Sequence, residues 1–211
     1  RRVLLCLGRY VPRKNFDAFQ KHSKDLVKKK TENHYSFEKY CQKLTKLGYL
    51  SDGRLTEKGE FASQIYSDEI LTGALFATDF YKQLNTYQTL LLIAAVCYES
   101  RERTQFHHKF PSQDAHKLQH LLRTHHFAGR DKRFEDIMDI TALIQPCYEG
   151  ANLFDLAKNT SLQEGDVIRF LRQILDRIRQ VKTATKDHHL TSTLHDCQKR
   201  VISCLKDVDV V

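Results

Sequence analysis

The clearest pattern of apolar and polar positions lies between residues 161 and 181. Apolar side chains recur there at the i, i+3, i+4, i+7 spacing of one helix face: Val167, Ile168, Leu171, Ile174, Leu175, Ile178 and Val181. The opposite side carries Arg169, Arg172, Gln173, Asp176 and Gln180. Ser161 and Glu164 have the spacing of a capping box, which predicts a helix start near Leu162. We therefore expect an amphipathic helix over 162–181, with one face in a core and the other open to a partner.

A second pattern marks the centre of the fold. Residues 90–96 are apolar on every side, which is typical of a helix packed all round in a bundle. The flanking pattern predicts helices over 68–84 and 86–99, separated at Asn85. Further helices are expected over 112–127 with Ser112 as cap and Gly129 as stop, and over 134–145, 150–158 and 193–205.

The segment from residue 35 to residue 65 has a different pattern. We expect a helix that Gly48 ends, with inward positions at Phe37, Cys41, Leu44 and Leu47. A turn at 51–53 then joins two short strands, and Thr56 can cap a following helix whose Phe61 and Ile65 close a small core. A helix followed by a hairpin is typical of a winged helix.

Composition narrows the fold class. The chain has 211 residues with only 8 Gly and 3 Pro, and it shows no strand–helix–strand rhythm, which favours an all-α fold. The predicted architecture is a winged helix with a short β-hairpin at 34–67, followed by a helical bundle at 68–211. Residues 1–33, with a helix at 16–30, are expected to form a connector from an upstream domain. The sequence starts at Arg1 with neither a methionine nor a signal-peptide pattern, so we expect it to be a fragment.

Charge points to an anionic partner. Thirty-four Lys and Arg against 26 Asp and Glu give a net charge of +8 and a pI near 9.2, as in domains that meet nucleic acid. A solvated basic surface without a ligand is the alternative, both for the whole chain and for Lys39, Lys43 and Lys46 on the first helix. No apolar run reaches the ~18 residues of a membrane span, so we expect a soluble protein with no membrane partner. Six cysteines without a CxxC pair favour free thiols in a reducing compartment, so we expect an intracellular protein, cytoplasmic or nuclear.

Candidate chemistry is sparse. His116 and His120 have i, i+4 spacing, but the sequence lacks the glutamate of a zinc-protease helix, so solvent-exposed histidines are the preferred interpretation. The six cysteines form no CxxC pair, and the motifs GxxxxGK[ST], GxGxxG and GxSxG are absent. We assign no catalytic residue, no metal site and no cofactor to this chain.

Several segments, taken in order, carry a family resemblance. They are 47–76, with Leu-Thr-x-Lys-Gly at 55–59; 87–103; 148–181, with a Gly and Phe at 150–154 and Glu-Gly-Asp at 164–166; and the closing helix at 198–205. Over about residues 35–211 the chain resembles the C-terminal region of superkiller-type, exosome-associated DExH RNA helicases. In that family the region is a winged helix followed by a helical bundle, the DSHCT domain.

The resemblance implies a function. In the parent enzymes two RecA-like domains use ATP and Mg²⁺ to pull single-stranded RNA 3′ to 5′ past a ratchet helix, which 162–181 resembles. Arg169 and Arg172 would then contact phosphates, and Gln173 and Asp176 would contact sugar hydroxyls or base edges. Family members typically have Arg where Gln173 stands, so Arg172 or Arg177 would compensate for that departure. An exosome-type complex is the implied assembly partner.

Two other classes of protein remain open from the sequence. A stand-alone winged-helix module would act in transcription or as a scaffold and bind duplex DNA through the helix that carries Lys39 to Lys46. A zinc-dependent hydrolase built on the histidines would hold stoichiometric metal.

Overall fold

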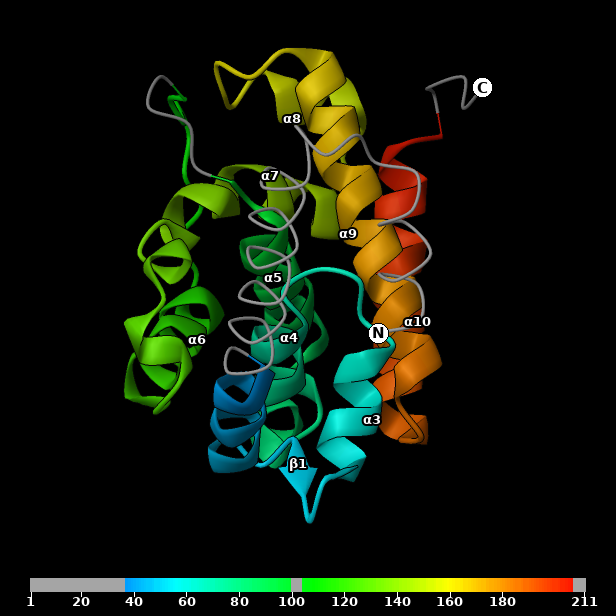
Figure 1. Ribbon diagram of the computed structural model, residues 1–211. Helices are drawn as coiled ribbons and strands as arrows, with labels where there is room; N and C mark the ends of the chain where they lie inside the picture. Colours follow the sequence, from blue (N-terminus) through cyan, green and yellow to red (C-terminus); the bar gives the residue numbers. More distant parts are fainter. Residues whose placement is uncertain (1–36, 100–103, 207–211) are drawn as a thin grey trace, which may run out of the picture. The chain divides into compact units, whose positions relative to one another are not determined.

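The computed structural model describes residues 37–99 and 104–206 (Figure 1). The chain divides into two compact units, at residues 1–54 and 55–211. The predicted connector over 1–33 and its helix lie outside the described residues.

The first unit contains a helix at 37–46, which ends as predicted before Gly48 with φ +77°. The expectation that Phe37 faces inward is wrong, because Phe37 is 65% exposed. The hairpin strands are β1 (Leu50–Ser51) and β2 (Arg54–Leu55), and the division between the units falls within β2. Asp52 and Gly53 both have positive φ, at 50° and 74°, as a tight two-residue hairpin turn requires.

The second unit is helical, which confirms the all-α class with a small hairpin. Its helices are α3 (Glu57–Ser63), α4 (Glu69–Phe76), α5 (Thr86–Cys97), α6 (Gln113–Thr124), α7 (Ile137–Glu149), α8 (Leu153–Ala157), α9 (Glu164–Ala184) and α10 (His188–Cys204). Three short 3-10 turns are η2 (Asp79–Gln83), η3 (Ala128–Arg130) and η4 (Lys132–Phe134). Among the described residues, no helix is both long and apolar enough to cross a membrane.

Helix α5 lies at the centre of this unit, as the apolar pattern predicted. Leu90, Leu91, Leu92 and Ile93 are all fully buried. The helix contacts α6, α7, α9 and α10 (Figure 1). Asn85 begins it with a capping box, since Asn85 Oδ1 accepts from the Gln88 N–H at 2.8 Å and Gln88 Oε1 accepts from the Asn85 N–H at 3.0 Å.

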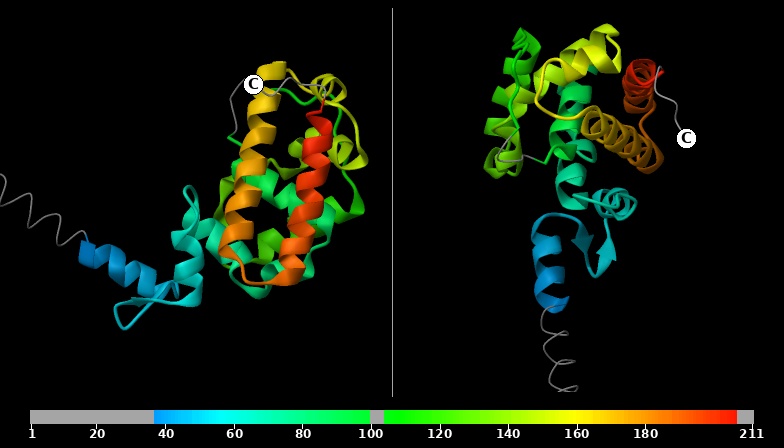
Figure 2. Two further views of the ribbon diagram at one scale, coloured as in Figure 1. Left: turned by 90° about the vertical axis from the view of Figure 1, so that its right-hand side faces the viewer. Right: turned by 90° about the horizontal axis from the view of Figure 1, so that it is seen from above.

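Helices α9 and α10 run antiparallel and side by side on the surface of the bundle (Figure 2). Asp187 caps α10 by accepting the Leu190 N–H at 2.8 Å, and it also accepts the Tyr81 hydroxyl at 2.8 Å. The cap therefore ties the start of α10 to η2.

The predicted start of α9 is wrong by two residues. Ser161 is no capping residue: its Oγ accepts from the Gln105 N–H and its own N–H donates to Gln105 O, both at 2.9 Å. An antiparallel bridge between Phe106 and Thr160 brings residue 105 to this position, so a distant strand contact displaces the local cap. The helix begins at Glu164 after Gln163 and continues to Ala184.

Other predicted boundaries also shift. The single helix expected over 68–84 is divided into α4 and η2, with Thr78 accepting from Phe80 N–H at the break. Helix α6 keeps its Ser112 cap but ends at Thr124, and α10 begins at residue 188 rather than 193. Gly129 does not end α6; it lies in η3, where a Cβ would stand 2.5 Å from Arg123 O.

Helix α3 belongs to the bundle. Thr56 caps it as expected, accepting from the Gly59 N–H at 3.1 Å. Phe61 and Ile65, however, lie in one core with α4, α5 and α9, and do not close a separate small core. The winged-helix assignment and the domain boundaries at 34 and 67 stay predictions.

Candidate functional site

One side of α9 is core, as predicted. Val167, Leu171, Ile174, Ile178 and Val181 are fully buried. Because this apolar stripe fixes the rotation of the helix against α5 and α10, it also determines which side chains reach the surface.

The surface side carries a straight row of polar residues. Arg169, Gln173, Asp176 and Gln180 follow one another at spacings of four, three and four residues, so the row is about 16 Å long. The first three are exposed, and Gln180 is half-buried. Arg172 is also exposed and lies about 60° round the helix from Arg169. We call Arg169, Gln173, Asp176 and Gln180 the α9 row.

A groove runs beside the α9 row. Two hollows, of about 50 and 350 Å³, share Cys97, Tyr98, Glu99 and Gln173 in their walls. The smaller one reaches Arg169 and Asp166, and the larger one extends past Asp176 and Gln180 to Tyr66. The α9 row thus forms one wall, and the C-terminal end of α5 with the segment after it forms the other.

The charges in this region are mixed. The side chains of Arg169 and Arg172 make no hydrogen bond or ion pair with another residue that the structure describes, so both guanidinium groups can bind an anionic ligand. Acidic Asp166, Asp176 and Glu99 lie in or beside the same groove. The groove can therefore bind a ligand that combines anionic groups with hydrogen-bonding ones.

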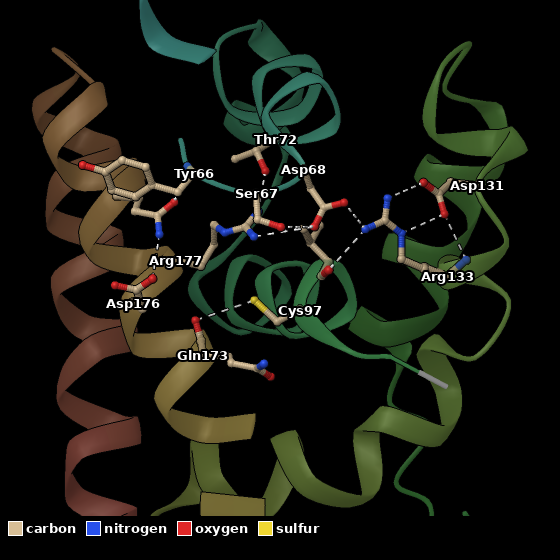
Figure 3. Close-up of polar contacts among 12 residues, drawn as sticks. Tyr66, Ser67, Asp68, Thr72, Cys97, Asp131, Arg133, Gln173, Asp176 and Arg177 are labelled. Atoms are coloured by element: carbon tan, nitrogen blue, oxygen red, sulfur yellow. Dashed lines mark hydrogen bonds and ion pairs between the residues drawn. The ribbon is translucent and has the colours of Figure 1, made fainter. Parts of the chain in front are cut away.

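Arg177 is placed differently from the other predicted site residues. Its side chain is only 8% exposed, and its guanidinium donates to Thr72 Oγ1 at 2.8 Å and lies 3.6 Å from Asp68 Oδ2 (Figure 3). The structure therefore brings Arg169, Arg172, Gln173 and Asp176 together on the surface, while Arg177 is held inside the bundle.

Asp68 is the centre of this internal network. Its other oxygen, Oδ1, accepts from Arg133 Nη1 at 2.6 Å, and Arg133 Nη2 also pairs with Asp131 Oδ2 at 2.8 Å (Figure 3). The hydrogen bond from Arg133 holds the pKa of Asp131 below its usual range. Asp68 has φ +52°, a left-handed conformation that costs a non-glycine residue about 1 kcal/mol or more. The ion pairs to both arginines offset that strain.

Cys97 lies in the wall of the groove but is no nucleophile. Its thiol donates to Gln173 O at 3.7 Å, and burial raises its pKa to about 12. The thiol is therefore protonated at neutral pH, and the nucleophilic thiolate is not formed.

No described histidine lines the two hollows beside α9. His116 and His120 are exposed on α6, whereas the His125 ring packs edge-on against Phe80 at 5.0 Å. His125 Nδ1 accepts from the Ala128 N–H at 3.1 Å, and burial lowers its pKa. Within residues 37–99 and 104–206, no group of three His, Cys, Asp or Glu side chains is placed to hold a metal ion.

The sequence model of the DSHCT (NUC185) domain matches residues 52–202, which is more than half of the chain. The chain belongs to the DSHCT (NUC185) family. This domain is a C-terminal domain of superkiller-type RNA helicases. A comparison with curated proteins finds no match.

The match begins within the hairpin and includes the whole α9 groove, so the DSHCT domain coincides closely with the second compact unit. Sequence reasoning missed Tyr66, Asp68 and Glu99 as residues of this groove. Asp68 precedes a helix and has the pattern of a capping residue, yet it makes no side-chain cap bond. No local signal distinguishes a capping aspartate from one that pairs with arginines 65 and 109 residues away.

Proposed function

We propose that this chain is the RNA-contacting C-terminal domain of an ATP-dependent DExH helicase in RNA processing or decay. Helix α9 acts as the ratchet helix, and single-stranded RNA passes along its surface side. The RecA-like domains of the same helicase lie upstream, and an exosome-type complex is the proposed assembly partner.

The observation that carries the proposal is the surface side of α9. Arg169 and Arg172 are exposed and have no partner among the described residues, and Gln173 and Asp176 lie next to them above a fully buried apolar face. Arginines that are free to pair suit phosphates, and amide and carboxylate groups suit ribose hydroxyls and base edges.

The mixed charge of the groove suits a domain along which RNA translocates better than one that binds RNA tightly. Each forward step of a strand must break the contacts made in the previous step, so a row of uniformly basic residues would hold it too firmly. The α9 row has one arginine, two glutamines and one aspartate, so we expect its contacts with RNA to be short-lived.

ATP and Mg²⁺ are assigned to the upstream domains. The phosphate-loop motif GxxxxGK[ST] is absent from all 211 residues, so the backbone cradle that binds the triphosphate comes from another part of the helicase. The role of this chain is to bind and orient the strand.

Reversing the charge of both arginines tests the proposal. We expect Arg169→Glu/Arg172→Glu to weaken binding of single-stranded oligouridylate by about 1–3 kcal/mol and to reduce the salt dependence of the affinity. Fluorescence anisotropy with a labelled oligonucleotide at several salt concentrations measures both quantities.

The matched control is Lys117→Glu/Arg123→Glu on α6, which makes the same change in net charge at exposed positions. Unchanged affinity and salt slope in the folded α9 variant, or an equal loss in the α6 variant, would remove α9 from the RNA path.

A second candidate function is duplex DNA binding by the helix at 37–46. The observation in its favour is that Lys39, Lys43 and Lys46 are all exposed at a spacing of one helix face. Preference for duplex DNA over single-stranded RNA, lost in Lys39→Glu/Lys43→Glu, would favour this function over the first.

A further inference from the structure

Tyr66 is exposed to an unusual degree. Its relative exposure is 88%, the highest of the large apolar side chains in the part of the chain that the structure describes. An aromatic ring left in water gains nothing from the hydrophobic effect, so such a position is more useful to a ligand than to the fold.

The backbone of Tyr66 is nevertheless held on both sides. Ile65, directly before it, is 5% exposed in the bundle core. Two residues later, Asp68 is fixed by Arg133 and Arg177. The Tyr66 N–H itself donates to Gln180 Oε1 at 3.1 Å. The ring is thus presented from a fixed backbone, which lowers the entropy lost when it binds a ligand.

Tyr66 stands at the end of the α9 row. Gln180, the last residue of the row, accepts from the Tyr66 backbone and donates to Asp176 Oδ2 at 2.6 Å. Tyr66, Asp176 and Gln180 line the same hollow, and Figure 3 shows the ring beside α9, turned away from Asp68. From Arg169 to Gln180 the row spans about 16 Å, which corresponds to about five bases at a stacked spacing of about 3.4 Å.

We propose that Tyr66 is a base-stacking residue for single-stranded RNA at the Gln180 end of the α9 row. The inference rests on the proposed function, because it extends the same strand beyond Asp176. The face of an aromatic ring accepts any base, so the contact tolerates every sequence that a translocating strand presents. Gln180 and Asp176 lie where they can hydrogen-bond the ribose hydroxyls of the stacked nucleotide.

The surroundings of the ring favour RNA over a protein partner. The neighbouring groove residues include Ser67, Asp176 and Gln180, which are polar. A protein interface has a contiguous apolar core at its centre, and a single ring among polar groups does not provide one.

The first test compares Tyr66→Ala with Tyr66→Phe in the 211-residue chain. The probe is a fluorescein-labelled oligouridylate or oligoadenylate of about 12 nucleotides, bound at about 50 mM salt, where phosphate contacts are strong. Loss of the ring should weaken binding about 5- to 150-fold, whereas Tyr66→Phe keeps the stacking face and should stay within about twofold.

A second measurement reports stacking directly. The chain contains no tryptophan, so Tyr66→Trp introduces a single tryptophan at the proposed contact, which can be excited selectively over the tyrosines. Saturating oligonucleotide should quench its emission. Phe154→Trp is the matched control, since Phe154 is 48% exposed on α8, and its emission should not change.

The outcomes separate this inference from the function on which it rests. Tyr66→Ala with unchanged affinity, while Arg169→Glu/Arg172→Glu weakens binding, overturns the Tyr66 contact alone. If Tyr66→Ala weakens binding and the arginine variant does not, the Tyr66 contact stands and the strand does not pass Arg169 and Arg172, which overturns the proposed path along α9. If the wild-type chain binds neither oligonucleotide, both proposals fail. Quenching of Tyr66→Trp by an apolar peptide and not by RNA also overturns the inference.

Discussion

The carboxylate of Asp68 links two parts of the bundle, because it pairs with Arg177 from α9 and with Arg133 from η4. The backbone of Asp68 leads directly into a third part, α4. A buried arginine without its carboxylate is costly, since the charge has lost water and gained no counter-charge. Arg177 would keep only the neutral hydroxyl of Thr72.

We therefore predict that Asp68→Asn lowers the free energy of unfolding by about 1–3 kcal/mol. Asparagine tolerates the left-handed backbone at this position, so the substitution removes the charge and leaves the conformation allowed. Urea unfolding followed by circular dichroism measures the difference.

The control for this prediction is Arg177→Met. Asp68 then keeps Arg133 at 2.6 Å, so the loss should be smaller than in Asp68→Asn. An Asp68→Asn variant as stable as the parent would mean that the network contributes nothing to stability.

At the scale of elements, side-chain caps fix the starts of five helices of the second unit, whereas α4, α7 and α9 have no side-chain cap. Asn85, Ser112, Asn152 and Asp187 each accept a backbone N–H three residues on, and Thr56 does the same for α3. Helix α9, the helix on which the proposed function rests, has no such cap. Its start is instead held by the bridge between residues 105–107 and 159–161.

We predict that Asp187→Ala destabilises the protein by about 1 kcal/mol, because α10 loses its cap. The Leu190 N–H, and then the Tyr81 hydroxyl, lower the pKa of Asp187 below its usual value. The carboxylate's contribution is therefore present above the unfolded pKa of about 3.9 and is lost as the pH falls through the lower folded pKa.

Urea unfolding at neutral and acidic pH checks this prediction. Asp187→Asn keeps a capping oxygen without the charge, so its stability deficit at neutral pH should shrink towards zero in acid. A deficit that stays constant with pH would show that the charge of Asp187 plays no part.

At the scale of the whole molecule, stability depends on the central helix. Because α5 contacts α6, α7, α9 and α10, a cavity in it also loosens the packing of α9, the helix of the proposed RNA site. We predict that Leu91→Ala, at a fully buried position, costs about 2–5 kcal/mol.

The control is Ile202→Ala on α10, where the side chain is 43% exposed, and we expect a clearly smaller loss. Thermal unfolding of the two variants compares them. An equal, small loss in both would contradict a core centred on α5.

The sequence by itself determined the helical class, the buried face of α9 and the central position of α5. These follow from periodicity, which depends only on which residues are apolar and how far apart they stand. The Asp52-Gly53 turn and the caps at Thr56 and Ser112 were also predictable, because each depends on residues within four positions of one another.

Only the tertiary structure decided the start of α9, the placement of Phe61 and Ile65, and the groove. Ser161 pairs with Gln105, 56 residues away, and Arg177 meets Thr72, 105 residues away. In the sequence, nothing distinguishes Arg177 from the other basic residues of its helix. Nothing distinguishes Tyr66 from any other aromatic residue that lies between a core position and the start of a helix. Arg177 forms an internal ion pair and Tyr66 stays exposed because of the helices that pack beside them. That packing is set by contacts between residues far apart in the chain.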